Sequence, residues 1–168
     1  MVVGADLCNT IANVNLELLK YFSINYLTYP FSEVPQGFFE TSRGLEILLK
    51  AEPLPNAHAV LRNLNGQGHR IEYITNRPKS AYFVTRRWLE LNGFPAGRIV
   101  FTENPEEKAN YVISRGIQLF FEDDPRVISN LNKTGALEIF VKDWQYNRSL
   151  VRQQGLKSFK RWSEFLVS

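Results

Sequence analysis

Short apolar runs along the chain alternate with segments in which apolar residues recur every three or four positions. The runs are typical of buried parallel strands, and the recurring pattern is typical of amphipathic helices. We predict strands at Met1–Ala5, Ile71–Ile74, Leu119–Phe121 and Glu138–Val141, with a weaker candidate at Ile99–Phe101. We predict helices around Ala57–Leu64, Ala81–Leu91 and Val127–Leu131.

Residues that commonly begin or end helices flank the predicted helices. Gly66 and Gly68 follow the first helix, and Asn92-Gly93 follows the second. Asp124 and Pro125 suit the N-cap and the first position of the third helix. Strands that alternate with such helices indicate βαβ units. We therefore expect an α/β fold with a Rossmann-like parallel sheet flanked by helices.

The first two predicted strands are separated by roughly 65 residues, far more than one crossover helix needs. The excess holds helical patterns at Val14–Phe22 and Leu45–Leu49, with the aromatic, proline-punctuated stretch Tyr26–Phe31 between them. We interpret residues 14–52 as a small helical cap inserted into a core domain of residues 1–13 and 53–168. The alternative is one long irregular loop, which is uncommon in a compact domain.

Composition narrows the class of protein. A chain of 168 residues with 44% hydrophobic and 22% charged residues resembles an ordinary globular domain and excludes a disordered or fibrous protein. Cys8 is the only cysteine, which excludes an intramolecular disulfide and argues against a Cys/His zinc site. No apolar run reaches the ~18 residues of a membrane span, and no leader pattern is present. We expect a cytoplasmic protein with no membrane partner.

The basic residues are scattered, apart from one cluster at Lys157, Lys160 and Arg161. Such a cluster suits contact with nucleic acid or lipid, or the solvated face of a last helix. We favour the helix face and expect no nucleic acid polymer as a partner. The net charge of +3 is compatible with an enzyme that acts on small anions.

Polar side chains follow the predicted strands. Asp6 comes after the first strand, Thr75-Asn76-Arg77 after the second, and Glu122-Asp123 after the third strong run, while Lys108 opens the helix before that run. The carboxyl ends of parallel strands share one edge, where ligands bind. Each residue alone has an ordinary alternative: Asp6 as a helix cap, Thr75 and Asn76 as turn formers, Arg77 as an exposed structural arginine, and Lys108 as a surface lysine.

Together these groups suit phosphoryl chemistry. Asp6 and Asp123, or its neighbour Glu122, offer the oxygen ligands that Mg²⁺ prefers. Thr75 can hydrogen-bond a phosphoryl group, Arg77 is a further candidate contact, and Lys108 can offset the negative charge. A carboxylate nucleophile divides hydrolysis into two easier steps.

In their order along the chain, Asp6-Leu7-Cys8-Asn9-Thr10, Thr75, Lys108 and Glu122-Asp123 resemble the four motifs of the haloacid dehalogenase superfamily. The segment Gly68–Pro78 and the later Tyr146-Asn147-Arg148 are similar to segments of bacterial 5'(3')-deoxyribonucleotidases. The resemblance covers nearly the whole chain, including an inserted cap.

The resemblance implies a role for each matching position. Asp6 would be the nucleophile and a Mg²⁺ ligand, and the backbone carbonyl of Cys8 would bind the same ion. Thr75 would hold the phosphoryl group, with Asn76 and Arg77 beside it, and Lys108 would stabilise the charge around Asp6. Asp123 would bind the metal directly, and Glu122 would assist, often through water. The implied substrate is a small phosphorylated metabolite, with a nucleoside monophosphate favoured.

Cys8 departs from the pattern, because phosphatases of this superfamily carry an aspartate there as general acid and base. A thiol with an ordinary pKa of about 8.5 is mostly protonated at neutral pH and serves poorly in that role. A catalytically impaired relative that binds a phosphorylated ligand or a protein partner is therefore a second hypothesis. A receiver-like regulatory domain is a third, against which the long insertion argues.

Five aromatic residues of the expected cap are candidates to stack on a base or sugar, with packing inside the cap as the alternative: Tyr26, Tyr29, Phe31, Phe38 and Phe39. The sequence indicates no oligomeric state.

Overall fold

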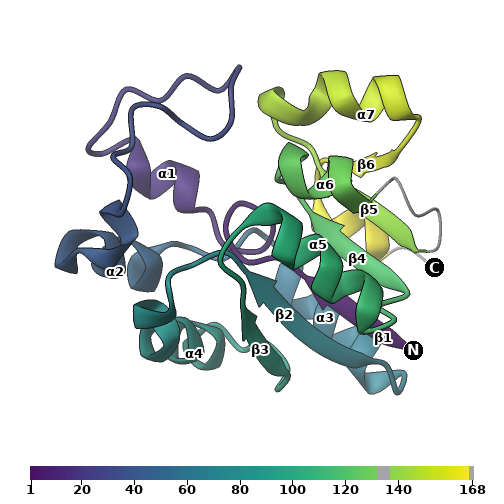
Figure 1. The fold of residues 1–168 in the computed structure, drawn as a ribbon. Coiled ribbons are helices and arrows are strands. Elements are labelled where there is room, and N and C mark those ends of the chain that lie inside the picture. Colours follow the sequence, from purple (N-terminus) through teal and green to yellow (C-terminus); the bar gives the residue numbers. More distant parts are fainter. Residues whose placement is uncertain (132–136, 167–168) are drawn as a thin grey trace.

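The computed structural model describes residues 1–131 and 137–166, which form a six-stranded sheet between helices (Figure 1). The strands are β1 (Val2–Ala5), β2 (Arg70–Thr75), β3 (Arg98–Phe101), β4 (Leu119–Glu122), β5 (Glu138–Lys142) and β6 (Lys157–Phe159). Their order is β3-β2-β1-β4-β5-β6, and each neighbouring pair is parallel. The predicted α/β fold and all the predicted strands are confirmed, with ends that differ by at most one residue.

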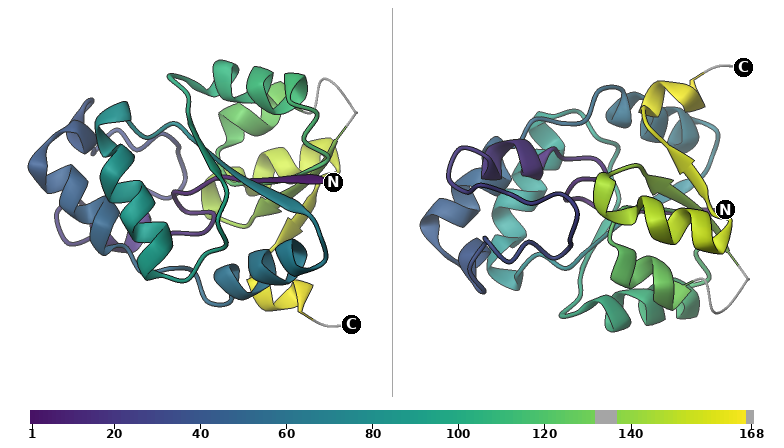
Figure 2. Two further views of the ribbon diagram at one scale, coloured as in Figure 1. Left: turned by 90° about the horizontal axis from the view of Figure 1, so that it is seen from below. Right: turned by 90° about the horizontal axis from the view of Figure 1, so that it is seen from above.

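The α-helices are α1 (Val14–Leu18), α2 (Ser42–Lys50), α3 (Ala57–Gly66), α4 (Tyr82–Leu91), α5 (Pro105–Ser114), α6 (Pro125–Leu131) and α7 (Arg148–Gln154). Short 3-10 helices occupy η1 (Phe38–Glu40), η2 (Lys79–Ala81), η3 (Gln145–Asn147) and η4 (Trp162–Phe165). Helices α5 and α6 cover one face of the sheet, and α3 and η4 cover the other (Figure 2). Across the described ranges, no helix combines the length and the apolar character that crossing a bilayer requires.

Strand β1 lies at the centre of the sheet and is buried on both faces. Val3 and Ala5 belong to the core under α3, and Val2 belongs to the core under α5 and α6. This burial explains why the strand is a continuous apolar run rather than an alternating one. Gly4 faces the ring of Phe120 on the neighbouring strand β4 at close range.

The chain between β1 and β2 contains α1, η1, α2 and α3, and α1 and α2 lie beyond the end at which β1 leaves the sheet (Figure 1). Helix α1 ends at Leu18, earlier than the pattern Val14–Phe22 predicts, and Leu19 is half-exposed. Helix α2 begins after Thr41, whose hydroxyl accepts the N–H of Gly44 at 3.0 Å. Residues 19–37 form turns and loop, while α2 extends beyond the predicted Leu45–Leu49 at both ends.

The prediction of a last helix around Lys157, Lys160 and Arg161 is wrong. Gly155, with a φ of +61°, ends α7, and Lys157 begins the edge strand β6. Phe159 is buried and its ring packs edge-on against Phe121 at a centroid distance of 5.9 Å. The apolar contact with the sheet holds this segment extended, and its basic residues lie at the sheet edge.

Substituting Gly4 with alanine is expected to lower the free energy of unfolding by about 1–3 kcal/mol. An ideal Cβ there would lie 2.7 Å from Cδ2 of Phe120 in the packed core. Gly66→Ala is the matched control, because no atom lies within 4 Å of its Cβ and alanine favours helix by up to about 1 kcal/mol. Urea denaturation measures both variants, and equal stability of Gly4→Ala and the parent would contradict the packing described.

Candidate active site

Two neighbouring strands deliver the acidic residues to one place. Asp6 directly follows β1, and its backbone N–H donates to the carbonyl of Phe121 on β4 at 2.9 Å. Glu122 ends β4 and Asp123 follows it. Carboxylate oxygens of Asp6, Glu122 and Asp123 all lie within 4.8 Å of one another, and all three residues are buried. The parallel topology therefore gathers the three predicted acidic residues, as the sequence pattern indicated.

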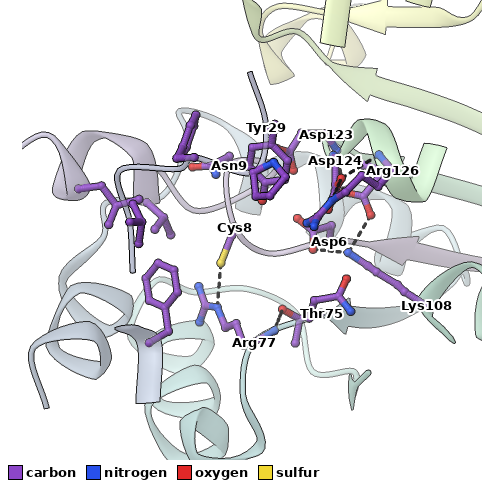
Figure 3. A pocket seen from close by; sticks show the side chains of 18 residues that line it. Asp6, Cys8, Asn9, Tyr29, Thr75, Arg77, Lys108, Asp123, Asp124 and Arg126 are labelled. Carbon is purple, nitrogen blue, oxygen red and sulfur yellow. Dashed lines mark hydrogen bonds and ion pairs between the residues drawn. The ribbon is translucent and has the colours of Figure 1, made fainter. Parts of the chain in front are cut away.

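Lys108 lies between two of these carboxylates. Its Nζ is 2.5 Å from Oδ1 of Asp6 and 2.7 Å from Oε2 of Glu122, and the side chain is 2% exposed (Figure 3). Helix α5 positions Lys108. The side chain of Asn104 caps the helix, which begins at Pro105, so Lys108 lies in the first turn. Lys108 is thus a buried charge within the site and not a surface lysine.

The cluster has more negative than positive charge. When ionised, the carboxylates of Asp6, Glu122 and Asp123 carry three negative charges against the single positive charge of Lys108, which leaves two. Burial and the charge of Asp6 raise the pKa of Glu122 to about 8. Burial, with Asp6 and Glu122 nearby, also raises the pKa of Asp123 well above its usual range. Burial alone would lower the pKa of Lys108, but the two carboxylates raise it.

This donor set fits a divalent cation. Buried carboxylate oxygens at mutual distances below 4.8 Å are the hard ligands that Mg²⁺ takes, and two missing positive charges match its valence. Burial and neighbouring negative charge raise the pKa values of Glu122 and Asp123, and a cation bound near them would favour their ionised forms.

Hydrogen bonds fix the acidic loop in place. Oδ1 of Asp123 accepts from the Thr10 hydroxyl at 2.7 Å, and its Oδ2 accepts from the Tyr146 hydroxyl at 2.5 Å. Oε1 of Glu122 accepts the backbone N–H groups of Asp123 and Asp124 at 2.8 and 3.0 Å. Thr10 and Tyr146 belong to the motifs found in the sequence, but their hydrogen bonds to Asp123 were not predicted, because neither residue is near Asp123 in the chain.

The turn after β2 brings three further predicted residues to the site. Thr75 is buried, and its Oγ1 accepts the backbone N–H of Arg77 at 3.1 Å. The side-chain amide of Asn76 instead donates to the carbonyl and the hydroxyl of Thr102, at 3.2 and 3.1 Å. The amide of Asn76 therefore ties this turn to the loop that follows β3.

Arg77 is 4% exposed, so the alternative of an exposed structural arginine does not hold. Its Nε donates to the sulfur of Cys8 at 3.2 Å and its Nη1 to the Thr85 hydroxyl at 3.0 Å. Within the described part of the chain, its Nη2 has no hydrogen-bond partner and no carboxylate forms an ion pair with it. Lys108 and Arg126, which line the same cavity, are both paired with carboxylates.

Cys8 lies on the opposite side of Asp6 from Lys108, next to Arg77 (Figure 3). Burial raises the pKa of the Cys8 thiol above its usual value; the Arg77 charge opposes this shift, and Asp6 adds to it. The thiol is therefore neutral at physiological pH and accepts a hydrogen bond from Arg77.

The cavity beside these groups holds about 230 Å³ and joins a polar floor to an apolar wall. Its floor consists of the carboxylates, Lys108 and the turn after β2. Tyr29, Phe31 and Phe39 belong to its wall, whereas Tyr26 and Phe38 do not line it. Of the five aromatic candidates, three thus face the cavity and two pack elsewhere.

Comparison with known proteins gives relatives that share part of the sequence. A Bacillus cereus protein named "Putative nucleotidase" is 35% identical over 100 residues, which cover 58% of this chain and 52% of that protein. An Oceanobacillus iheyensis protein of similar name is 34% identical over 117 residues, 67% of this chain and 58% of that protein. A Chlorobaculum tepidum protein named "Putative 5'(3')-deoxyribonucleotidase" is 30% identical over 100 residues, 56% of this chain and 46% of that protein. The chain spans about half the length of these relatives, and no protein-family model matches it.

Solved structures match nearly the whole chain. A haloacid dehalogenase family hydrolase from Deinococcus radiodurans superposes with a TM-score of 0.65 at 12% identity, covering 97% of this chain and 92% of that one. The chain has the haloacid dehalogenase-like fold. A second structure with this fold, described as a predicted phosphoglycolate phosphatase from Haemophilus somnus, gives a TM-score of 0.62 at 16% identity, with 98% and 96% covered. The resemblance stated from the motifs is thereby confirmed in fold, and in sequence by the nucleotidase-named relatives.

The stability of this haloacid dehalogenase-like chain without added cation is expected to fall as the pH rises from about 5 to about 8. The folded state keeps a proton on Glu122 up to a pKa of about 8, whereas the unfolded chain releases it near 4.5, so folding becomes less favourable across that window. Thermal unfolding at fixed ionic strength measures the effect, and Glu122→Gln should show a flatter profile. A rise in stability between these pH values would contradict the proposed charge imbalance.

Proposed function

We propose that this chain is a Mg²⁺-dependent phosphatase that hydrolyses a phosphate monoester, with a nucleoside monophosphate as the favoured substrate. The observation that carries the proposal is the cluster of three buried carboxylates around Lys108 at the edge of a haloacid dehalogenase-like sheet. The nucleotidase names of the relatives support the choice of substrate. The D. radiodurans structure is described with bound phosphate, which supports an oxyanion ligand for this fold.

The residues that would hold the cation follow from the donor set. Asp6 and Asp123 would bind it directly, together with the backbone carbonyl of Cys8, and Glu122 would assist through water. When bound, a divalent cation supplies positive charge to the phosphoryl oxygens and to these carboxylates.

Asp6 would attack phosphorus with the carboxylate oxygen that is free of Lys108. The Asp6 oxygen forms a bond to phosphorus while the bond from phosphorus to the ester oxygen breaks, and the leaving oxygen takes the electron pair. Water then attacks the aspartyl phosphate, releases inorganic phosphate and restores the carboxylate. Lys108 holds Asp6 in one orientation throughout.

The turn of Thr75, Asn76 and Arg77 would bind the phosphoryl group together with Lys108. Arg77 is the strongest candidate for a direct contact, because this residue lines the cavity and its buried Nη2 has no protein partner among the described residues. A buried cation without a carboxylate is costly, and an anionic ligand offsets that cost.

The segment of residues 14–52 would serve as a cap over the core formed by residues 1–13 and 53–168. Tyr29, Phe31 and Phe39 from this segment form apolar wall in the cavity, opposite the polar floor. The phosphate would lie on the floor and the organic part of the ester against the wall, which also keeps water from the reacting atoms.

A second candidate function is binding without turnover, and Cys8 is the observation that favours it. Burial raises the pKa of the Cys8 thiol that faces the cavity, so this thiol is a poor proton donor for the leaving oxygen. A catalytically impaired chain would retain the phosphate and cation contacts and recognise a phosphorylated ligand or a protein partner.

Asp6→Asn is expected to abolish release of inorganic phosphate from nucleoside monophosphates, because the amide is not a nucleophile and carries no charge. Phosphate release with Mg²⁺ present measures this for the parent and the variant. Asp143→Asn is a matched control, since Asp143 pairs with the exposed Arg148 and does not line the cavity. Turnover that survives in Asp6→Asn would refute the mechanism. Phosphate binding by a parent without turnover would favour the second candidate.

Cys8→Asp is expected to raise kcat, by up to ~10²-fold, since general acid–base help typically contributes at least that factor. Arg77 is placed to donate a hydrogen bond to the new side chain, which would orient it in the cavity. Cys8→Ser, similar in size but without an ionisable group, is expected to stay near the parent. Equal rates for the two variants would show that position 8 takes no part in proton transfer.

A further inference from the structure

The segment Trp144–Asn147, which links β5 to α7, contacts both loops that carry the acidic residues. The Trp144 indole N–H donates to the carbonyl of Asn9 at 2.7 Å. The Asn147 side-chain amide donates to the backbone carbonyl of Asp123 and to that of Lys142, both at 2.9 Å. The segment therefore ties the end of β5 to the loops after β1 and β4.

Tyr146, within this segment, acts on the side chain of Asp123. Its hydroxyl donates to Oδ2 at 2.5 Å, while the Thr10 hydroxyl donates to Oδ1 at 2.7 Å. Tyr146 is 8% exposed and Asp123 is 1% exposed, so water does not replace either bond. Each carboxylate oxygen has two lone pairs, so one hydrogen bond apiece fixes the carboxylate and leaves it able to bind a cation.

The ring of Tyr146 packs against aromatic residues that line the cavity, but Tyr146 does not line the cavity itself. Its centroid lies 4.7 Å from that of Tyr29 and 5.8 Å from that of Phe31, and both of these residues line the cavity. The Tyr29 ring also contacts a residue that binds a neighbouring acid. The Arg126 guanidinium lies 5.3 Å from the Tyr29 ring centroid and binds Asp124 at 2.8 and 3.1 Å. Tyr29 thus packs on two residues that hold consecutive carboxylates.

We infer that Tyr146 is a positioning residue that fixes Asp123 for the cation and links the packing of Tyr29 in the cavity wall to that carboxylate. The inference rests on the proposed cation site. Tyr146 then contacts both the loop that would bind the organic part of the substrate, through Tyr29, and the carboxylate that would bind the cation, Asp123. Ordering of Tyr29 by a ligand favours the arrangement of Asp123 that binds the cation, and the reverse also holds.

The test is the affinity for Mn²⁺ alone, which takes oxygen ligands as Mg²⁺ does and is counted directly by electron paramagnetic resonance. Tyr146→Phe keeps the ring against Tyr29 and removes only the hydroxyl, and we expect a dissociation constant about 10-fold larger than that of the parent. Tyr111→Phe is the matched control, because it removes another tyrosine hydroxyl that donates to a carboxylate, Glu72, at 2.9 Å. This variant is expected to bind Mn²⁺ as the parent does.

Tyr29→Leu tests the link to the cavity wall with the hydroxyl of Tyr146 in place. It is expected to weaken Mn²⁺ binding about threefold in the parent and to add no further loss in Tyr146→Phe, which is the pattern of coupled residues. Independent effects of the two substitutions would overturn the link. Near-ultraviolet circular dichroism of each variant checks that the aromatic packing is retained.

The outcomes separate this inference from the proposed function. Unchanged Mn²⁺ affinity in a folded Tyr146→Phe variant would overturn the role of Tyr146 and leave the cation site standing. A parent that binds no Mn²⁺ would overturn the cation site and the role of Tyr146 with it. Weaker binding in Tyr146→Phe and in Tyr111→Phe alike would show a general loss of stability and would also overturn the assigned role.

Discussion

Three carboxyl groups and a single ammonium group share one water-excluded place in this molecule, and the remaining negative charge shapes what surrounds them. Removing like charges from water is costly, so each group needs close polar partners. Asp123 has two hydroxyl donors, Glu122 has two backbone N–H donors, and Lys108 bridges to the third acid, Asp6. These contacts come from strand ends, a helix start and a C-terminal segment, so elements far apart in the sequence contribute to one site.

Three parts of the chain form the site, and each supplies a different kind of group. The edge of the sheet supplies the charged groups, since β1 and β4 are neighbours and end together. The chain between β1 and α2 supplies the apolar wall. The segment Trp144–Asn147 joins the two, because its side chains hold the acidic loops and pack against the ring of Tyr29. The proposed contacts to the organic group and to the ion would therefore share one structural support.

Much of the sheet and of the charged floor follows from local sequence. Strands buried on both faces are continuous apolar runs, and residues after parallel strands meet at one edge, so β1, β4, Asp6 and Asp123 were predictable. The edge strand β6 was not, because it is three residues long and only Phe159 in it is buried. The burial of Arg77 was also hidden, since it depends on Thr85 and Cys8, which are distant in sequence. For the same reason the hydroxyl of Tyr146, 23 residues from Asp123, gave no local signal.

The place of β1 in the sheet has a consequence for how the chain reaches this structure. β1 pairs with β2 on one side and β4 on the other, and both partners come later in the sequence, at Arg70–Thr75 and Leu119–Glu122. During synthesis this apolar strand remains unpaired until those residues have been added. Non-local pairing of this kind is slow, and exposed strand edges promote association between incomplete chains. The strand that Asp6 follows is therefore a segment at which incomplete chains would associate.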